Sequence, residues 1–194
     1  MMQHDQLGLL ENRLGSERYR RLIERLDATF EGAPAENTNE SAALRMLAAS
    51  EFFRTLVERQ IDWLEEAADL RQPTIDALLE SVNQQSFYEQ DEQAVLRSLR
   101  VLRQRAMLHI VWRSFTSDNG LNETLAAMTT LADFIIQCAV SYAEKAVSKR
   151  YGEAIGDDTG ALQKLIVVGM GKLGGRELNL SSDIDIMFIY DEPG

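Results

Sequence analysis

Hydrophobic residues recur at spacings of three and four through most of the first 150 residues, which is the pattern of amphipathic helices. Residues 41–70 have spacings close to three and four and predict one amphipathic helix, with apolar positions at Leu44, Leu47, Phe52, Leu56, Ile61 and Leu64. A short helix is predicted over residues 74–82, and longer ones over residues 91–115 and 122–150. The cluster Ser117-Asp-Asn-Gly120 predicts the turn between the two long helices.

The pattern changes after Tyr151. Residues 152–160 contain three glycines and two adjacent aspartates, which is typical of a loop and indicates a domain boundary. Short apolar runs at Lys164–Val168 and Ile184–Tyr190 then predict two strands. Helices followed by strands predict an α+β protein. Because two strands alone do not form a stable sheet, we expect that the sheet is only begun here. The mostly α-helical domain, residues 1–155, is followed by the beginning of a second, truncated domain, residues 160–194.

Composition narrows the classes of partner and compartment. The net charge of −11 argues against a nucleic-acid partner, whose phosphates must be neutralised by Lys and Arg. It does not argue against a small phosphate ligand, because local cations or a metal ion reverse the field in one pocket. The single cysteine, Cys138, fits a reducing compartment. The chain shows no signal peptide and no uninterrupted apolar run of about 20 residues, so we expect a cytoplasmic protein with no membrane partner.

The segment that carries candidate chemistry is Val168–Ile186, in which two aspartates follow a glycine-rich turn. Asp183 and Asp185 are two positions apart on the expected strand, so both carboxylates should project from one face while Ile184 and Ile186 enter the core. Two neighbouring carboxylates repel each other, and a divalent cation such as Mg²⁺ relieves that repulsion. A pair of such cations aligns attacking and leaving oxygens around a phosphorus atom. The segment therefore indicates metal-dependent chemistry on a phosphate.

The same segment also fits a different function. Gly169-Met-Gly171-Lys-Leu-Gly174 matches the dinucleotide-binding pattern G-x-G-x-x-G, and Asp191 lies about 20 residues further on, where a ribose-binding acid is expected. That fold needs a parallel crossover of a dozen or more residues between its strands. Only the nine residues from Gly175 to Asp183 separate Gly174 from Ile184, so we disfavour this alternative. A turn into an edge strand, with Asp185 facing solvent and no chemistry, also stays open.

Gly169–Ile186 reads G-M-G-K-L-G-G-R-E-L-N-L-S-S-D-I-D-I. It resembles the signature G-x-G-K-L-G-G-x-E-L-N-x-x-S-D-x-D-L of the glutamine synthetase adenylyltransferases, a family within the DNA polymerase β-like nucleotidyltransferases. Ile186 replaces the usual Leu. The helix over residues 96–113 is more loosely similar to a basic helix of that family, with His109 where an Arg is more common. The resemblance implies that residues 160–194 begin the mixed sheet of a polymerase β-like domain.

Family members resemble a tandem of two catalytic domains with opposing activities on one tyrosine of glutamine synthetase. One removes AMP by phosphorolysis and releases ADP, and the other attaches AMP from ATP. The position of the motif and Asn179 resemble the adenylyl-removing copy. The resemblance implies Mg²⁺ or Mn²⁺ as cofactor, bound by catalytic Asp183 and Asp185 and by a third carboxylate expected beyond Gly194. The implied nucleotide and phosphate contacts are Gly171, Lys172, Gly174, Gly175, Arg176 and Ser182.

The implied partners are glutamine synthetase, ATP or ADP, phosphate and a PII-type regulatory protein. Which glycine pair contacts phosphate stays open, because Gly174-Gly175 lies closer to the first aspartate than in the wider superfamily and Gly171 is followed by Lys172. A non-catalytic helical docking fragment of the same enzyme also stays open. Several residues outside the motif are interpreted as structural: a solvated face for Arg97, Arg100, Arg103 and Arg105, and packed positions for Trp63, His109, Trp112 and Cys138.

Overall fold

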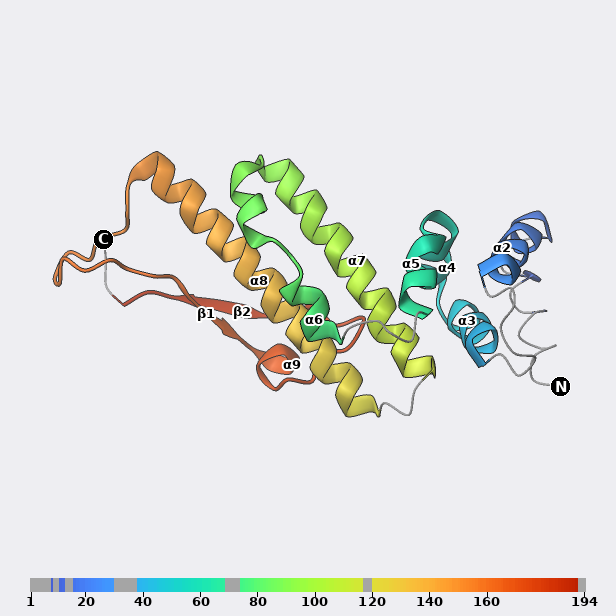
Figure 1. Ribbon diagram of the computed structural model, residues 1–194. Coiled ribbons are helices and arrows are strands. Elements are labelled where there is room, and N and C mark those ends of the chain that lie inside the picture. The colour runs from blue at the N-terminus through green and yellow to red at the C-terminus, as the bar shows by residue number, and fades with distance from the viewer. Residues whose placement is uncertain are drawn as a thin grey trace. The chain divides into compact units, whose positions relative to one another are not determined.

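The computed structural model describes residues 16–29, 38–68, 74–116 and 120–191, together with residues 8, 11 and 12 (Figure 1). This part of the chain is mostly helical, with one small antiparallel sheet near its C-terminal end, which confirms the expected α+β class. The elements are α2 (Ser16–Thr29), α3 (Thr38–Ala49), α4 (Glu51–Arg59), α5 (Ile61–Ala68), α6 (Ile75–Glu80), the 3₁₀ helix η1 (Gln84–Glu89), α7 (Glu92–Thr116), α8 (Leu121–Tyr151), β1 (Ile166–Gly169), α9 (Gly171–Gly174) and β2 (Ile186–Ile189).

The chain divides into two compact units. The first unit consists of Met1–Pro73 and Gln104–Leu121, and the second of Thr74–Arg103 and Asn122–Gly194. Helix α7 therefore contributes its beginning to the second unit and its end to the first. The domain boundary expected between residues 155 and 160 stays a prediction.

In the first unit, the single helix expected over residues 41–70 is wrong, because three shorter helices, α3, α4 and α5, take its place. The breaks fall at Ser50, whose backbone is extended (φ −137°, ψ 121°), and at Gln60 (φ −137°, ψ 60°). The break at Ser50 changes which phenylalanine faces the core. Phe53 is buried as a result, whereas Phe52, expected on the apolar face, is 41% exposed.

The core of the first unit is apolar and contains one buried arginine. Its buried side chains include Met46, Leu47, Val57, Leu64 and Leu108. Arg54 is also buried, and its guanidinium donates a 2.6 Å hydrogen bond to the Leu47 carbonyl. That bond provides an acceptor for one of the guanidinium donors, and a buried polar group without a partner would be costly.

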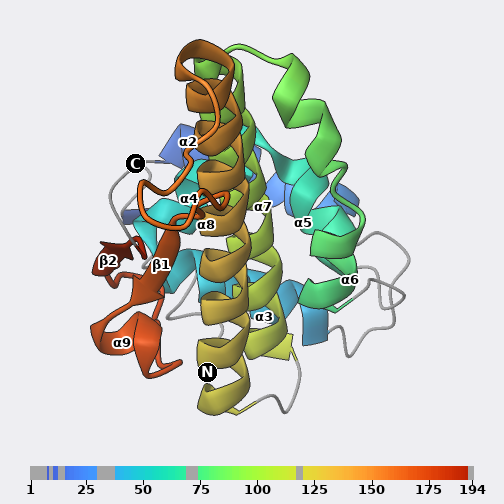
Figure 2. The same cartoon turned by 90° about the vertical axis from the view of Figure 1, so that its left-hand side faces the viewer.

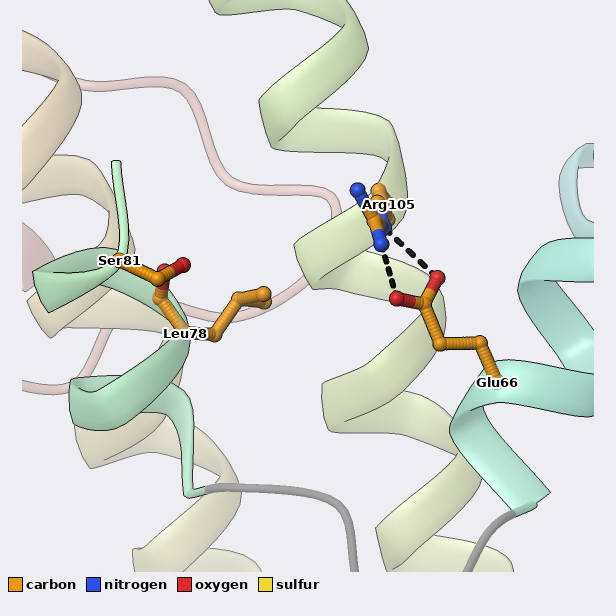
Figure 3. A network of polar contacts seen from close by, with 4 residues as sticks. All are labelled: Glu66, Leu78, Ser81 and Arg105. Atoms are coloured by element: carbon orange, nitrogen blue, oxygen red, sulfur yellow. Dashed lines mark hydrogen bonds and ion pairs between the residues drawn. The ribbon is translucent and has the colours of Figure 1, made fainter. Parts of the chain in front are cut away.

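The Arg105 side chain, expected on a solvated face, instead forms an ion pair. Figure 3 shows its guanidinium on α7 bonded through two nitrogens to both carboxylate oxygens of Glu66 on α5. The Nε to Oε2 distance is 2.8 Å. Trp112 and His109 are buried as expected, and Trp63 is half-buried.

In the second unit, α8 packs against η1 and the beginning of α7. Cys138 is buried in a cluster with Phe87, Val95 and Leu99, which confirms its expected position. By length and composition alone α8 is also apolar enough to cross a membrane, but the core helix of a soluble protein passes the same test. The expected absence of a membrane partner stays a prediction.

Strands β1 and β2 form an antiparallel hairpin that lies along one side of α8 (Figure 2). The register pairs Ile166 with Ile189 and Gly169 with Ile186. Antiparallel pairing excludes the parallel crossover of a dinucleotide-binding fold, as the short connection predicted. The second strand begins later than expected, so Asp183 and Asp185 precede it and Ile184 is 44% exposed instead of entering the core.

The late start of β2 has a local cause. The partner strand ends at Gly169, and the chain then turns into α9 at Gly171 with φ +51°. One further bond follows the ladder, from the Met170 N–H to the Asp185 carbonyl at 2.8 Å. Residues 183 and 184 consequently have no strand opposite them.

Candidate functional site

The two aspartates lie in the loop that joins α9 to β2, and both are exposed. The Asp185 backbone is fixed by its bond from Met170 N–H. Its carboxylate lies beside Gly171, where a Cβ would be 3.6 Å from Oδ2. Within the described residues, neither the Asp183 nor the Asp185 carboxylate has a hydrogen-bond or ion-pair partner. Both carboxylates are therefore exposed to solvent.

The glycines of the turn have separate structural reasons. Gly171 adopts a left-handed backbone (φ +51°), which a side chain disfavours. At Gly174 a Cβ would lie only 2.4 Å from the Gly169 carbonyl oxygen, so α9 could not approach the end of β1. Gly175 is less restricted, because its Cβ would lie 3.3 Å from the Gly171 oxygen. Packing explains Gly174 without a ligand, and the phosphate contacts expected of these glycines stay a prediction.

Two of the expected phosphate contacts meet across the turn. The Lys172 ammonium donates to the Ser182 hydroxyl at 3.4 Å. The Ser182 hydroxyl in turn donates to the Asn179 side-chain oxygen at 2.7 Å, and the Ser181 N–H donates to the same oxygen at 3.2 Å. Asn179 thus orders the turn that leads into Asp183. The arrangement places the Lys172 ammonium beside the hydroxyl of Ser182, which is the residue immediately before Asp183.

Arg176 lies elsewhere. It is a non-glycine residue with a left-handed backbone (φ 58°), and its guanidinium is 3.5 Å from the Asp133 carboxylate on α8. It lines a pocket of about 410 Å³ together with Asp76, Glu80 and Thr130, and neither Asp183 nor Asp185 lines that pocket. The structure brings Lys172 to Ser182 and Gly171 to the Asp185 carboxylate, and it gives Arg176 a partner on α8.

Asp183 borders a separate pocket of about 430 Å³ between the loop and the long helices of the second unit. Met128, Leu131 and Ile135 of α8 form its apolar wall, and Arg103 of α7 reaches it. Arg103 is exposed, in agreement with the solvated face expected for it. No local pattern predicts that Arg103 and Asp183 border one pocket, because the two residues are far apart in the chain.

Residues 41–194, most of the chain, match the glutamate-ammonia ligase adenylyltransferase family. The chain belongs to this family.

Curated relatives in the glutamate-ammonia ligase adenylyltransferase family are bifunctional glutamine synthetase adenylyltransferase/adenylyl-removing enzymes. The chain is 49% identical to that of Thioalkalivibrio sulfidiphilus over 105 residues, which is 54% of this chain and 11% of the relative. It is 37% identical to that of Pseudomonas aeruginosa over 171 residues, 86% of this chain and 17% of the relative. The match to the Nitrosomonas eutropha enzyme covers 81% of this chain and 18% of the relative at 35% identity. The chain thus spans less than a fifth of these relatives.

The donor set of this family member suits a hard divalent cation in kind. Asp183 and Asp185 offer carboxylate oxygens, which Mg²⁺ and Mn²⁺ prefer. No group of three or more His, Cys, Asp or Glu side chains gathers in the described ranges at metal-binding distance. Two carboxylates with free oxygens therefore fit a cation as part of a ligand set, and the third carboxylate stays a prediction.

Proposed function

We propose that this chain carries the first part of an adenylyl-removing site, which releases AMP from an adenylylated tyrosine of glutamine synthetase by phosphorolysis and forms ADP. The observation that supports it most directly is the turn between β1 and β2. This turn brings Lys172 to Ser182 and Gly171 to Asp185. The choice of glutamine synthetase is supported by the names of the relatives.

In the proposed reaction, an oxygen of inorganic phosphate attacks the phosphorus of the AMP group. The bond between that phosphorus and the tyrosine oxygen breaks, and the tyrosine oxygen leaves and takes up a proton. The products are ADP and a free tyrosine hydroxyl. Negative charge grows on the leaving oxygen, so fixed cations and donors stabilise the transition state more than the bound substrates.

Lys172, Asp183 and Asp185 have separate roles in the proposed reaction. The Lys172 ammonium has protons beyond the one shared with Ser182, and it binds a phosphate oxygen. Asp183 and Asp185 hold the cation. A divalent cation bound there supplies neutralising charge for the phosphate oxygens and aligns the attacking and leaving oxygens. Cytoplasmic location and a PII-type regulatory partner belong to the same proposal, on the family resemblance.

The direction of the reaction is the finer part of the proposal. Asn179 supports removal, because this residue resembles the adenylyl-removing copy of the family, and its side chain orders the turn before Asp183. Attachment of AMP from ATP is the second candidate, since the names of the relatives contain both activities. Two radiolabelled substrates distinguish the two reactions. With labelled inorganic phosphate, removal transfers the label into ADP. With ATP labelled at the α-phosphate, attachment transfers the label to the protein.

A chimera tests the assignment. Residues 41–194 of this chain replace the matching stretch of the Pseudomonas aeruginosa relative, and release of ADP from adenylylated glutamine synthetase is measured. We expect Asp185→Asn to lower the rate by at least about 100-fold, because cation binding contributes several kcal/mol to the transition state. Asp191→Asn, the same change in an exposed aspartate after β2, should leave it unchanged. Retained activity in Asp185→Asn would contradict the metal-ligand assignment. The 194-residue chain alone is expected to release no ADP.

A further inference from the structure

The loop that carries the two aspartates is attached to α8 by a buried threonine. Thr129 is 1% exposed, and its hydroxyl makes two hydrogen bonds. It donates to the Leu125 carbonyl one turn earlier at 2.9 Å, and it accepts from the Leu178 backbone N–H at 3.3 Å. Residues 129 and 178 are 49 positions apart, so this bond ties the loop to a distant element.

The bond to Leu178 has no substitute in its surroundings. Leu178 is 3% exposed, so water does not readily replace the partner of its N–H. Within the described residues, the Thr129 hydroxyl is the partner of that N–H. A buried donor without a partner is costly, so a side chain of the same shape without an oxygen would release the loop here. Valine at position 129 is such a side chain.

The attachment continues to the carboxylates through a short, ordered stretch. One residue after Leu178, the Asn179 side chain accepts from Ser181 and Ser182, and the Ser182 N–H donates to the Asn179 carbonyl at 3.3 Å. The next residue is Asp183. A second link from α8, the pair of Asp133 and Arg176, is 42% and 61% exposed and therefore contributes little. Thr129 therefore makes a buried hydrogen bond between α8 and the segment that leads into the aspartates.

We propose that Thr129 is a positioning residue for the cation-binding loop, which it holds through Leu178 without touching the ligand. The proposal rests on the proposed function, in which Asp183 and Asp185 bind a divalent cation. Loss of the Thr129 hydroxyl, which accepts from the Leu178 N–H, does not change either carboxylate itself. It lowers the fraction of molecules whose loop is ready to bind, and the apparent affinity falls by the same factor.

The experiment uses the 194-residue chain, labelled with ¹⁵N and titrated with Mn²⁺, whose paramagnetism broadens nearby amide signals. The variants are Thr129→Val, Thr129→Ser, which keeps the hydroxyl, and Thr130→Val, the same change one residue along α8. We expect broadening centred on residues 169–186 in the original chain, in Thr129→Ser and in Thr130→Val. Thr129→Val should require an Mn²⁺ concentration at least about five-fold higher for the same broadening.

The outcomes separate the two proposals. Asp185→Asn is measured in the same way, and if it is broadened like the original chain, the metal-ligand assignment fails and the positioning role fails with it. If the original chain is not broadened at all, the positioning role is overturned, because the loop then binds no cation whose affinity Thr129 could raise. If the original chain binds and Thr129→Val binds equally well, only the positioning role is overturned. Equal weakening in Thr129→Ser and Thr129→Val would show that the hydroxyl is not the cause. Loss of the helical circular-dichroism signal in Thr129→Val would indicate a general structural role and also overturn it.

Discussion

Replacing Gly174 with alanine tests how closely α9 packs on the end of β1. The new Cβ would lie 2.4 Å from the Gly169 carbonyl oxygen and 3.1 Å from its carbon, whereas ordinary contact begins near 3.4 Å. One backbone segment must therefore move by about 1 Å, the difference between 3.4 and 2.4 Å. The obstacle is backbone, and Gly169 is paired with Ile186 in the hairpin, so no side chain can rotate out of the way.

The expected cost follows from this crowding. Inserting a methyl group into a well-packed site costs about 1–3 kcal/mol. Because about 1.4 kcal/mol is a factor of ten, the hairpin should open about 5 to 140 times more often. Hydrogen exchange measured by mass spectrometry detects this as faster exchange in peptides covering β1 to β2. Peptides covering α3 should be unaffected, since α3 belongs to the other compact unit.

Two other glycines provide a graded control. Gly120→Ala should have no effect, because no atom lies within 4 Å of its Cβ and its backbone is not left-handed. Gly175→Ala should be intermediate, with a closest distance of 3.3 Å. Unchanged exchange in Gly174→Ala would refute the packing explanation. The glycine at position 174 would then be better explained by close approach of a bound phosphate.

Two further predictions concern residues outside the loop. Burial raises the pKa of the Cys138 thiol, so iodoacetamide should react with the folded chain at pH 8 much more slowly than with the denatured chain; equal rates would contradict the buried position. Because the folded state then holds the proton more tightly, stability should fall as pH rises from the ordinary thiol pKa toward the raised one, and Cys138→Ala should lack this fall. Arg105→Met removes an ion pair whose side chains are 42% and 32% exposed, so it should cost less than about 1 kcal/mol, or roughly 2–4 °C in Tm, and less still in high salt. A salt-independent loss above 10 °C in thermal unfolding would show that the pair supports the core instead.

The long helices and the short helix α6 were predictable, but the division of residues 41–70 into α3, α4 and α5 was not predicted. Over residues 91–115 and 122–150 the apolar period continues without interruption, and α7 and α8 match the expected bounds within a residue or two. In residues 41–70 the breaks depend on single backbone conformations at Ser50 and Gln60. A signal was present, because the steps from Leu47 to Phe52 and from Leu56 to Ile61 are five residues long. Steps of five do not continue one helical face.

The direction of strand pairing in the hairpin could be predicted from the length of the connection between β1 and β2. The short connection excluded a parallel crossover, and the observed antiparallel pairing agrees. The start of β2 was wrong by two residues because a strand needs a partner, and β1 ends where Gly171 turns the chain into α9. The aspartates therefore belong to a loop, where tethers and not sheet geometry set their position.

This distinction explains which neighbours of the aspartates one sequence could predict. Lys172, Ser182 and Gly171 belong to the same short motif as the aspartates, so the contacts of Lys172 with Ser182 and of Gly171 with Asp185 link residues close in sequence. Thr129 lies 49 positions before Leu178, and nothing in the α8 pattern separates it from Thr130, its identical neighbour. Only the helix orientation buries one hydroxyl against the loop and leaves the other beside the Arg176 pocket. The two threonines therefore differ in place and not in chemistry, and the contrast between Thr129→Val and Thr130→Val measures that difference of place directly.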